Sequence, residues 1–251
     1  MSATLCAEKR RDDVAGPESD VAVKPDPELE EGGRLDALAN AFIGKLLDFG
    51  VDGIGPLQSS SEVLARVRSK HGEDRDRVVD AIVSEHIRKG AVGGFVTGVG
   101  GIFTMPVAIP VNVLEFYTFA TRMVAAIAEE RGYDVSSRST RAAVLLSLVG
   151  ADADELMRKA GVTTAMGMTG SGRLANLATS RLPKAAAMMV NKAVGFRLLT
   201  AVGGRALGRF VRFVPVAGGV IGAGLDGYLM KRIADHARRE FVDRESGAAA
   251  G

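Results

Sequence analysis

The chain has 251 residues, is 47% hydrophobic with only 5% aromatic residues, and carries a formal net charge of +2. This length suits one large domain or two small ones. The single cysteine, Cys6, excludes an intrachain disulfide framework and a zinc site built on cysteine ligands. The opening MSATLCAEKRRDDV is charged where a secretory signal needs an apolar core, so we expect a cytoplasmic protein.

The first 33 residues differ from the rest, because nine are acidic, four are basic and few are large and apolar. Such a segment buries too little surface to fold, so residues 1–33 are predicted to be a disordered acidic tail. The tail either keeps the protein soluble or competes for a basic surface on the same molecule. Residues 34–244 form the expected helical domain, and residues 245–251 a frayed tail.

Helical spacing of apolar residues begins after the tail and predicts an amphipathic helix that ends near residues 50–53. The residues that set this spacing are Leu35, Leu38, Phe42, Leu46 and Phe49. A turn at 54–59 precedes a short helix that Ser60 or Ser61 caps. A further helix is predicted over residues 75–89.

Residues 90–114, GAVGGFVTGVGGIFTMPVAIPVNVL, contain no charged residue and no histidine. A helix of this length would cross the apolar core of a bilayer, which is about 30 Å thick. Pro106 and Pro110 are expected to interrupt the helix, because proline removes a backbone donor and clashes with the preceding turn. We therefore expect an apolar hairpin, in contact with a membrane or buried in the protein, and keep a true span as the third alternative.

After the prolines the pattern stays helical, and no segment alternates with a period of two. The expected helices lie at residues 111–131, 136–150, 184–212 and 215–244. Residues 161–183 are interpreted as a flexible connection, and Gly203-Gly204 as a break in the third of these helices. The fold class is all-α: a compact multi-helix bundle with a Gly/Pro-rich apolar helical hairpin at its centre.

A second row of small residues lies near the C-terminus, where Gly218 and Gly222 are four residues apart. Gly90, Gly94 and Gly98 repeat at the same spacing, which places them on one helix face. Because rows of small residues let two helices approach closely, we expect the two segments to pack against each other.

Residues 156–225 form a basic sector of seventy residues with ten lysines and arginines and no acid. Arg205, Arg209 and Arg212 share one helix face. The sector is either an ordinary solvated face or a surface that attracts polyanions. Anionic lipid is the expected polyanion, since each cation near an anionic leaflet contributes about 1 kcal/mol. Nucleic acid is not expected, because the interleaved aromatics of single-strand binders are missing.

Catalytic and cofactor motifs are not found. The sequence contains no HExxH pair and no GxSxG elbow. Residues 167–174, GMTGSGRL, mimic a phosphate-binding loop but place Arg173 and Leu174 where lysine and Ser/Thr are required. Gly222, Gly224 and Gly227 match the dinucleotide fingerprint without a βαβ unit to follow. No catalytic residue, metal or cofactor is predicted, although an enzyme stays open.

Ionisable residues in apolar surroundings form the remaining candidate site, at Asn112, Glu115, Arg122 and Asp226. Glu115 and Arg122 are seven residues apart and share a helix face. A buried charge must be paired or neutralised, so these residues are expected to form one polar cluster. The cluster is either a structural ion pair or a site for a ligand or a lipid head group.

Several blocks resemble the EcsC family: GVDGIGPL (50–57), GGFVTGVGGIFTMPVAIPVN (93–112), NKAVGFRLL (191–199) and VPVAGGVIGAGLDG (214–227). The resemblance covers roughly residues 35–242. It implies a bacterial, helical, membrane-associated protein without an established biochemical role, and it carries no catalytic residue onto this chain.

Two functions follow from these patterns. The first is a non-enzymatic, membrane-associated protein on the inner face of the cell membrane, accessory to transport or envelope processes. It would bind anionic lipid through the basic sector and the hairpin at 90–114, with Arg205, Arg209 and Arg212 as contacts; a membrane-protein partner and a homo-oligomer stay open. The second is a soluble enzyme or small-ligand-binding protein with its site at Asn112, Glu115, Arg122 and Asp226.

Overall fold

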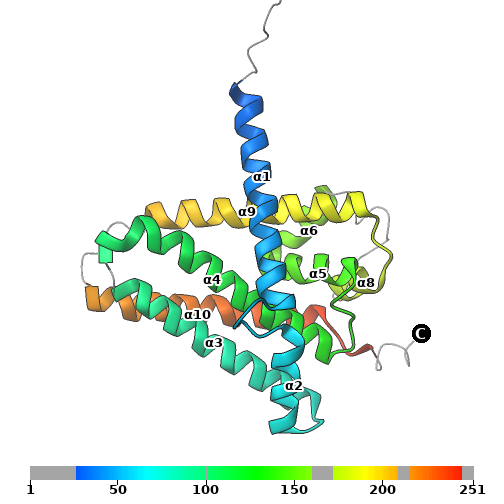
Figure 1. The fold of residues 1–251 in the computed structure, drawn as a ribbon. Coiled ribbons are helices and arrows are strands. Elements are labelled where there is room, and N and C mark those ends of the chain that lie inside the picture. Colours follow the sequence, from blue (N-terminus) through cyan, green and yellow to red (C-terminus); the bar gives the residue numbers. More distant parts are fainter. Residues whose placement is uncertain (1–26, 100, 160–171, 209–214, 245–251) are drawn as a thin grey trace, which may run out of the picture.

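The computed structural model describes residues 27–99, 101–159, 172–208 and 215–244. Within these ranges the chain forms helices and no strand, which confirms the predicted all-α bundle (Figure 1). The elements are α1 (Pro27–Leu47), a π-helical turn η1 (Asp48–Asp52), α2 (Ser60–His71), α3 (Arg75–Val99), α4 (Gly101–Glu130), α5 (Arg138–Val149), a 3₁₀ turn η2 (Gly150–Asp152), α6 (Ala153–Lys159), α8 (Arg173–Thr179), α9 (Lys184–Gly208) and α10 (Pro215–Glu240).

The helices α3, α4 and α10 pack together as the centre of the bundle. Helix α10 lies antiparallel to α3, since Arg238 near its end pairs with Asp80 near the start of α3 at 2.6 Å. Every residue from 120 to 128 of α4 is buried. A helix segment that is buried all round lies in the interior of a protein, so this part of α4 is the core of the molecule.

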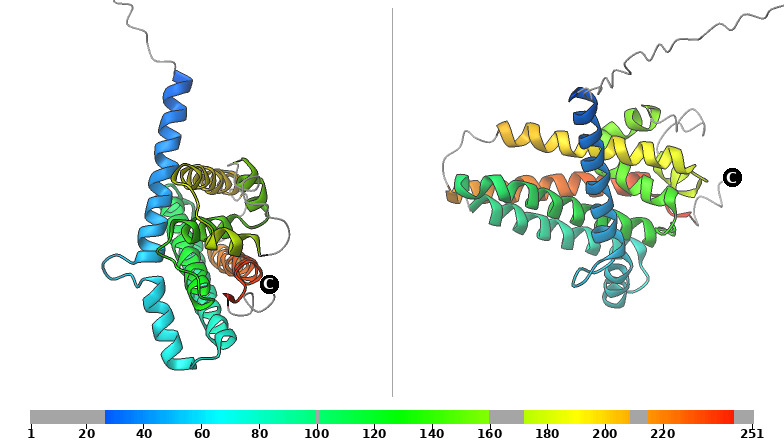
Figure 2. Two further views of the ribbon diagram at one scale, coloured as in Figure 1. Left: turned by 90° about the vertical axis from the view of Figure 1, so that its right-hand side faces the viewer. Right: turned by 45° about the horizontal axis from the view of Figure 1, so that its top comes forward.

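Four helix ends gather at one end of the molecule. Helix α3 ends at Val99 and α4 begins at Gly101, while α9 ends at Gly208 and α10 begins at Pro215. Both views that show the bundle side-on place these ends together, at the left in Figure 1 and in the right-hand panel of Figure 2. We call this region, defined by these four helix ends, the hairpin end.

The prolines do not interrupt the apolar run as predicted. Helix α4 continues through both Pro106 and Pro110, and the change of direction falls between Val99 and Gly101. A proline inside a helix costs about 3 kcal/mol, which is small beside the burial that a helix of 30 residues gains. The predicted helix at 75–89 likewise extends to Val99, because its glycines lie against α10 and are held by packing.

The N-terminal boundary of the helical part also differs from the prediction. Helix α1 begins at Pro27, inside the range 1–33 that was expected to be a disordered tail. Proline is favoured in the first helical turn, and acidic residues favour the positive end of the helix dipole, so Pro27 and the glutamates after it suit a helix start. The first turns of α1 project beyond the bundle (Figures 1 and 2). Residues 1–26 and 245–251 lie outside the described residues.

Helix α2 is capped one residue earlier than predicted. The Ser59 hydroxyl accepts a hydrogen bond from the Glu62 amide at 3.1 Å, and the Glu62 carboxylate accepts one from the Ser59 amide at 2.9 Å. This reciprocal pair is a capping box, which satisfies two of the free donors at the helix start. Ser60 is instead buried, and its hydroxyl donates to the Val51 carbonyl at 3.3 Å.

Two predictions for the second half of the chain are corrected. Residues 173–179, placed in a flexible connection, form α8, whose Leu174 and Leu177 are buried in the core. The glycines and serines of this segment do not prevent a helix, because Leu174 and Leu177 give α8 an apolar face that packs on the core. Helix α9 passes Gly203-Gly204 without a break and ends at Gly208. The rest of the predicted connection, 160–171, lies outside the described residues.

Candidate functional site

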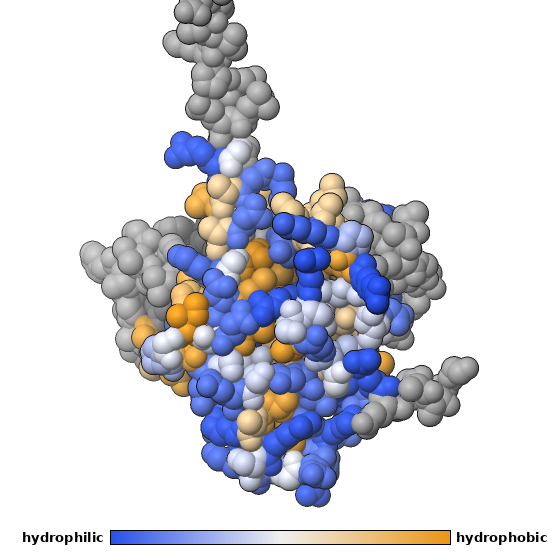
Figure 3. All heavy atoms as spheres, turned by 45° about the vertical axis from the view of Figure 1, so that its right-hand side comes forward, coloured by the Kyte–Doolittle hydropathy of each residue, from blue (hydrophilic) through white to orange (hydrophobic). Residues whose placement is uncertain are grey.

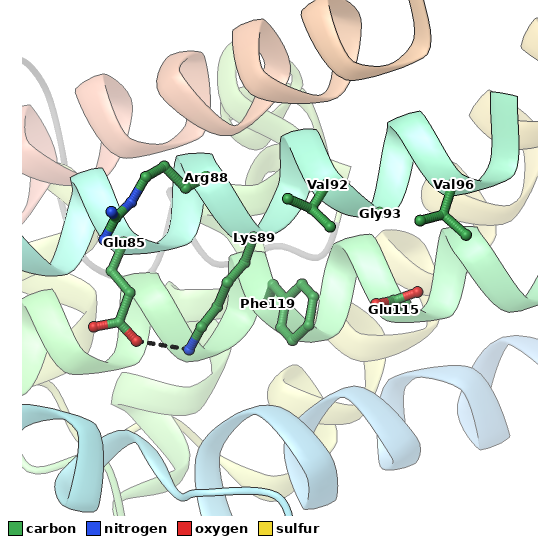
Figure 4. Close-up of a pocket in the computed structure, with 8 residues that line it drawn as sticks. All are labelled: Glu85, Arg88, Lys89, Val92, Gly93, Val96, Glu115 and Phe119. Atoms are coloured by element: carbon green, nitrogen blue, oxygen red, sulfur yellow. Dashed lines mark hydrogen bonds and ion pairs between the residues drawn. The ribbon is translucent and has the colours of Figure 1, made fainter. Parts of the chain in front are cut away.

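An open groove of about 500 Å³ runs between α3 and α4 (Figure 4). It is lined by Glu85, Arg88, Lys89, Val92, Gly93, Val96, Glu115 and Phe119. Six of these come from α3 and two from α4, so the antiparallel helix pair supplies the described lining. Among these described residues there is no cysteine, serine or histidine, and they offer charge and apolar surface to a ligand.

One end of the groove holds a network of paired charges. Glu85 accepts two hydrogen bonds from Arg66 of α2, at 2.8 and 3.0 Å, and a third from Lys89 at 2.6 Å. Burial raises the pKa of the Glu85 carboxyl, but the bonds from Arg66 and Lys89 outweigh it and lower the pKa to about 2. Glu85 is therefore ionised at neutral pH, and Lys89 is held against it.

Two further charges in the groove are free. Arg88 and Glu115 are both exposed, and neither makes a hydrogen bond or an ion pair within the described part of the chain. Figure 4 shows the Arg88 side chain directed away from Glu115, with Lys89, Val92 and the ring of Phe119 between the two. The two free charges therefore do not face each other across the groove.

Two buried polar side chains lie behind the groove. His86 is fully buried; its Nδ1 lies 2.8 Å from the Ile82 carbonyl, and its Nε2 has no hydrogen-bond partner among the described residues. Burial lowers the pKa of the His86 imidazole to about 4, and the nearby charges of Lys89 and Arg122 act in the same direction. His86 is therefore a neutral core residue at physiological pH.

Among the residues that the structure describes, Arg122 is bonded by the end of a helix and not by a carboxylate. Its Nη2 donates to the Phe49 carbonyl in η1 at 2.6 Å, and its guanidinium lies 5.9 Å from the centroid of the Phe119 ring. The carbonyls at a helix C-terminus carry partial negative charge, which favours a cation. Burial lowers the pKa of the Arg122 guanidinium, which nevertheless stays protonated. Arg122 joins the end of α1 to the core.

Three members of the predicted polar cluster lie in different surroundings. No hydrogen bond or ion pair joins Glu115, Arg122 and Asp226 among the described residues. Glu115 lies in the groove, Arg122 is buried against η1, and Asp226 packs against Gly94 on the side of α3 that faces α10. By the rotation of about 100° per residue, this side lies opposite the groove. Side-chain positions of Asn112 and Arg205, and all of Arg209 and Arg212, lie outside what the structure describes.

The basic sector is partly neutralised by acids from outside it. Arg173 pairs with Asp154 at 2.5 Å, Arg197 with Asp152 at 2.5 Å and Lys192 with Asp36 at 2.5 Å. The acid-free stretch in the sequence therefore does not give an acid-free surface. Residues far apart in the chain supply the counter-charges, which no local pattern reveals.

No sequence pattern indicated Glu85, Lys89 and His86 as part of a site. The spacing of Glu85 and Lys89, four residues apart on a helix, is a signal of an ion pair that was available. The contribution of Arg66, from another helix, left no such signal. Among the described residues no group of acids, histidines and cysteines suits a metal ion. In the same part of the chain no helix has the length and hydropathy of a membrane span.

Comparison with known proteins gives one match. The model of the EcsC protein family matches residues 57–244, from the turn before α2 to the end of the described chain. Helix α1 lies outside this range. No curated protein and no solved structure matched the chain. The groove lies wholly within the matched range.

Proposed function

The chain belongs to the EcsC protein family, and we propose that this member is a non-enzymatic protein whose hairpin end contacts an anionic membrane surface. The proposal includes the inner face of the cell membrane and an accessory role in a transport or envelope process. It rests on two properties of the hairpin end, exposed apolar side chains and nearby arginines.

Apolar side chains are exposed on the helices that lead to the hairpin end. Val92 and Val96 of α3 are 63% and 64% exposed, and Val220 near the start of α10 is 63% exposed. Phe95 is exposed as well. The sequence beyond them, residues 97–114, has no charged residue. Contiguous exposed apolar surface marks contact sites for membranes or partners, so this observation carries the proposal.

Three arginines of the basic sector lie in the sequence where α9 ends and before α10 begins. Arg205 lies in the last turn of α9, and Arg209 and Arg212 follow in the sequence before α10 begins at Pro215. Each cation near an anionic leaflet contributes about 1 kcal/mol. Other cations of the basic sector, such as Lys184, belong to the opposite end of α9. The proposal therefore assigns lipid contact to the C-terminal part of the sector and not to the sector as a whole.

Figure 3 shows a mainly hydrophilic lower end, where α2 and the start of α3 lie, and we therefore do not propose this end as the membrane contact. The ligand-binding alternative loses its main support, because Glu115, Arg122 and Asp226 do not form one site.

Co-sedimentation with vesicles tests the proposal. We expect the protein to pellet with vesicles of anionic phospholipid at low salt and to be released as salt rises, because screening shortens the reach of charge from about 10 Å at 0.1 M to about 3 Å at 1 M. Val92→Glu with Val96→Glu should abolish pelleting. Met188→Glu with Met189→Glu, equally exposed near the start of α9, is the matched control and should pellet normally. Absence of pelleting at low salt, or equal behaviour of the two double variants, would refute the proposal.

A further inference from the structure

Arg88 of α3 and Tyr228 of α10 lie at nearly the same level on one face of the antiparallel α3–α10 pair. A Cβ atom on Gly227 would lie 3.9 Å from the Ile87 side chain, so these two positions face each other. Arg88 and Tyr228 are the next residues of the two helices, and a rise of about 1.5 Å per residue keeps them within about 3 Å along the axis. A turn of about 100° per residue brings both to the same side of an antiparallel pair. Both are exposed, and Figure 4 shows Arg88 directed away from α4.

Two cations at this level are exposed and unpaired among the described residues. One is Arg88. The other is Arg232, one turn after Tyr228, whose guanidinium lies 6.0 Å from the centroid of the Tyr228 ring. Other charges along the outer side of the two helices are paired at 2.6 to 2.7 Å, namely Lys231 with Asp235 and Arg238 with Asp80. The free positive charge of this face therefore belongs to Arg88 and Arg232.

Toward the hairpin end the same face becomes apolar. Val92 and Phe95 lie about 6 and 10 Å from the level of Arg88 along the axis of α3. On α10, Val220 lies about 12 Å from Tyr228 in the same direction. All three apolar side chains are exposed. The face thus passes from two cations and an aromatic ring to apolar surface within about 12 Å.

We propose that this face enters an anionic leaflet, with Arg88 and Arg232 bound to lipid phosphates and with Phe95 and Val220 in the apolar region. The order matches a leaflet, in which phosphates overlie hydrocarbon and tyrosine is favoured at the boundary between them. A guanidinium suits phosphate, because its planar fork donates two parallel hydrogen bonds. The inference rests on the proposed membrane contact, and it names the face and the depth of that contact.

The flank of α3 that faces α4 is less suited to a leaflet. It carries Glu115, which is exposed and unpaired among the described residues, at the level of Gly93 to Val96 (Figure 4). An anionic leaflet repels a carboxylate, and moving that carboxylate into hydrocarbon is costly. The acid of α10 at a similar depth, Asp226, is instead buried against Gly94. Charge complementarity therefore selects the flank toward α10.

Tryptophan fluorescence tests the depth, because the chain contains no tryptophan. Phe95→Trp, Tyr228→Trp and the control Met189→Trp each place one reporter at an exposed position of the full-length protein. The vesicles are anionic and contain lipid brominated either near the head group or deep in the acyl chain. Deep bromine should quench Phe95→Trp more strongly, and shallow bromine should quench Tyr228→Trp more strongly. Met189→Trp should not be quenched, and equal quenching of Tyr228→Trp and Met189→Trp would overturn the inference.

Charge variants test the two arginines. Arg88→Gln with Arg232→Gln should weaken binding to anionic vesicles at low salt about thirtyfold, since each cation near the leaflet contributes about fivefold. The matched control is Arg138→Gln with Arg181→Gln, which removes the same charge from exposed positions outside this face that are unpaired among the described residues. The control should bind within about threefold of the wild type. Equal losses in the two double variants would show that net charge alone acts and would also overturn the inference.

The inference and the proposed membrane contact fail in different ways. A wild-type protein that does not pellet with anionic vesicles refutes the membrane contact itself. A wild-type protein that pellets while the Phe95→Trp and Tyr228→Trp reporters both stay unquenched keeps the membrane contact but places it on another face. The α3–α10 face would then be left for a second copy of the chain or an acidic protein.

Discussion

Gly94 of α3 and Gly222 of α10 meet with no room for a side chain between them. A Cβ atom on Gly94 would lie 2.6 Å from the carbonyl oxygen of Gly222, and one on Gly222 would collide with the carbonyl oxygen of Gly94. The same Cβ on Gly94 would also lie 2.6 Å from Oδ2 of Asp226. The two backbones are in direct contact, which only glycine at both positions allows.

We expect Gly222→Ala to lower the free energy of unfolding by about 1–3 kcal/mol, because the methyl group must push two backbones apart. Gly224 lies in the same helix with open space around its Cβ position. Gly224→Ala should therefore raise stability by up to about 1 kcal/mol, as alanine restricts the unfolded chain. Urea unfolding of the two variants measures the difference, and equal midpoints would show that the helices do not cross this closely.

The rows of small residues could be predicted from the sequence, because each row lies within a single helix. Glycines four residues apart share a face whatever the rest of the chain does, so the positions of Gly94 and Gly222 could be predicted from their segments alone. The same holds for the caps near Ser59 and Ser137, where a hydroxyl bonds an amide three residues on.

The partners of the charged groups could not be predicted in this way. Arg122 was expected to form a polar cluster with Glu115, which lies seven residues earlier on the same helix face, but it bonds the main-chain carbonyl of Phe49 in a π-helical turn. Every residue has a carbonyl, so no residue type marks this acceptor in the sequence. The break predicted at Pro106 was wrong, because the sequence shows the local cost of a proline in a helix but not the packing of the rest of α4, which outweighs that cost.

Arg122→Met should lower the free energy of unfolding by about 1–2 kcal/mol, because the Phe49 carbonyl loses its donor at the junction of η1 and the core. The methionine fills most of the space, so the loss reports the hydrogen bond more than a cavity. Binding to vesicles should be unchanged. Normal stability with loss of vesicle binding would move Arg122 from a structural role to the membrane contact.

Glu130 provides a test of buried charge. Its side chain is 1% exposed, and its carboxylate is bonded to Arg68 of α2 at 2.6 Å. Arg68→Gln leaves a buried carboxylate without its cation, which should cost about 3–5 kcal/mol at neutral pH. Arg77→Gln breaks the exposed pair with Asp74 and should cost about 1 kcal/mol or less. Thermal unfolding compares the two, and similar melting temperatures would mean that Glu130 is not buried as described.

The burial of His86 makes stability depend on pH in a defined window. Its pKa in the folded protein is about 4, below the ordinary value of 6.5. Between these values the unfolded chain binds a proton at this residue and the folded chain does not, so stability is lost as pH falls from about 6.5 to about 4. The loss from this residue should reach about 2 kcal/mol by pH 5 and about 3 kcal/mol at the lower limit.

Variants isolate this contribution. His86→Gln should flatten the fall in the free energy of unfolding between neutral pH and about pH 5, the window in which His86 titrates only in the unfolded chain. His71→Gln removes an exposed histidine at the end of α2 and should leave the slope unchanged. The Glu85 carboxyl does not interfere, since its pKa of about 2 lies below 4.5 and its contribution is lost only at lower pH. Burial also lowers the pKa of His236, so part of the slope should survive in His86→Gln. If His86→Gln left the pH dependence of the free energy of unfolding unchanged, other groups would cause all of it. That result would contradict the burial of a neutral imidazole beside Arg122.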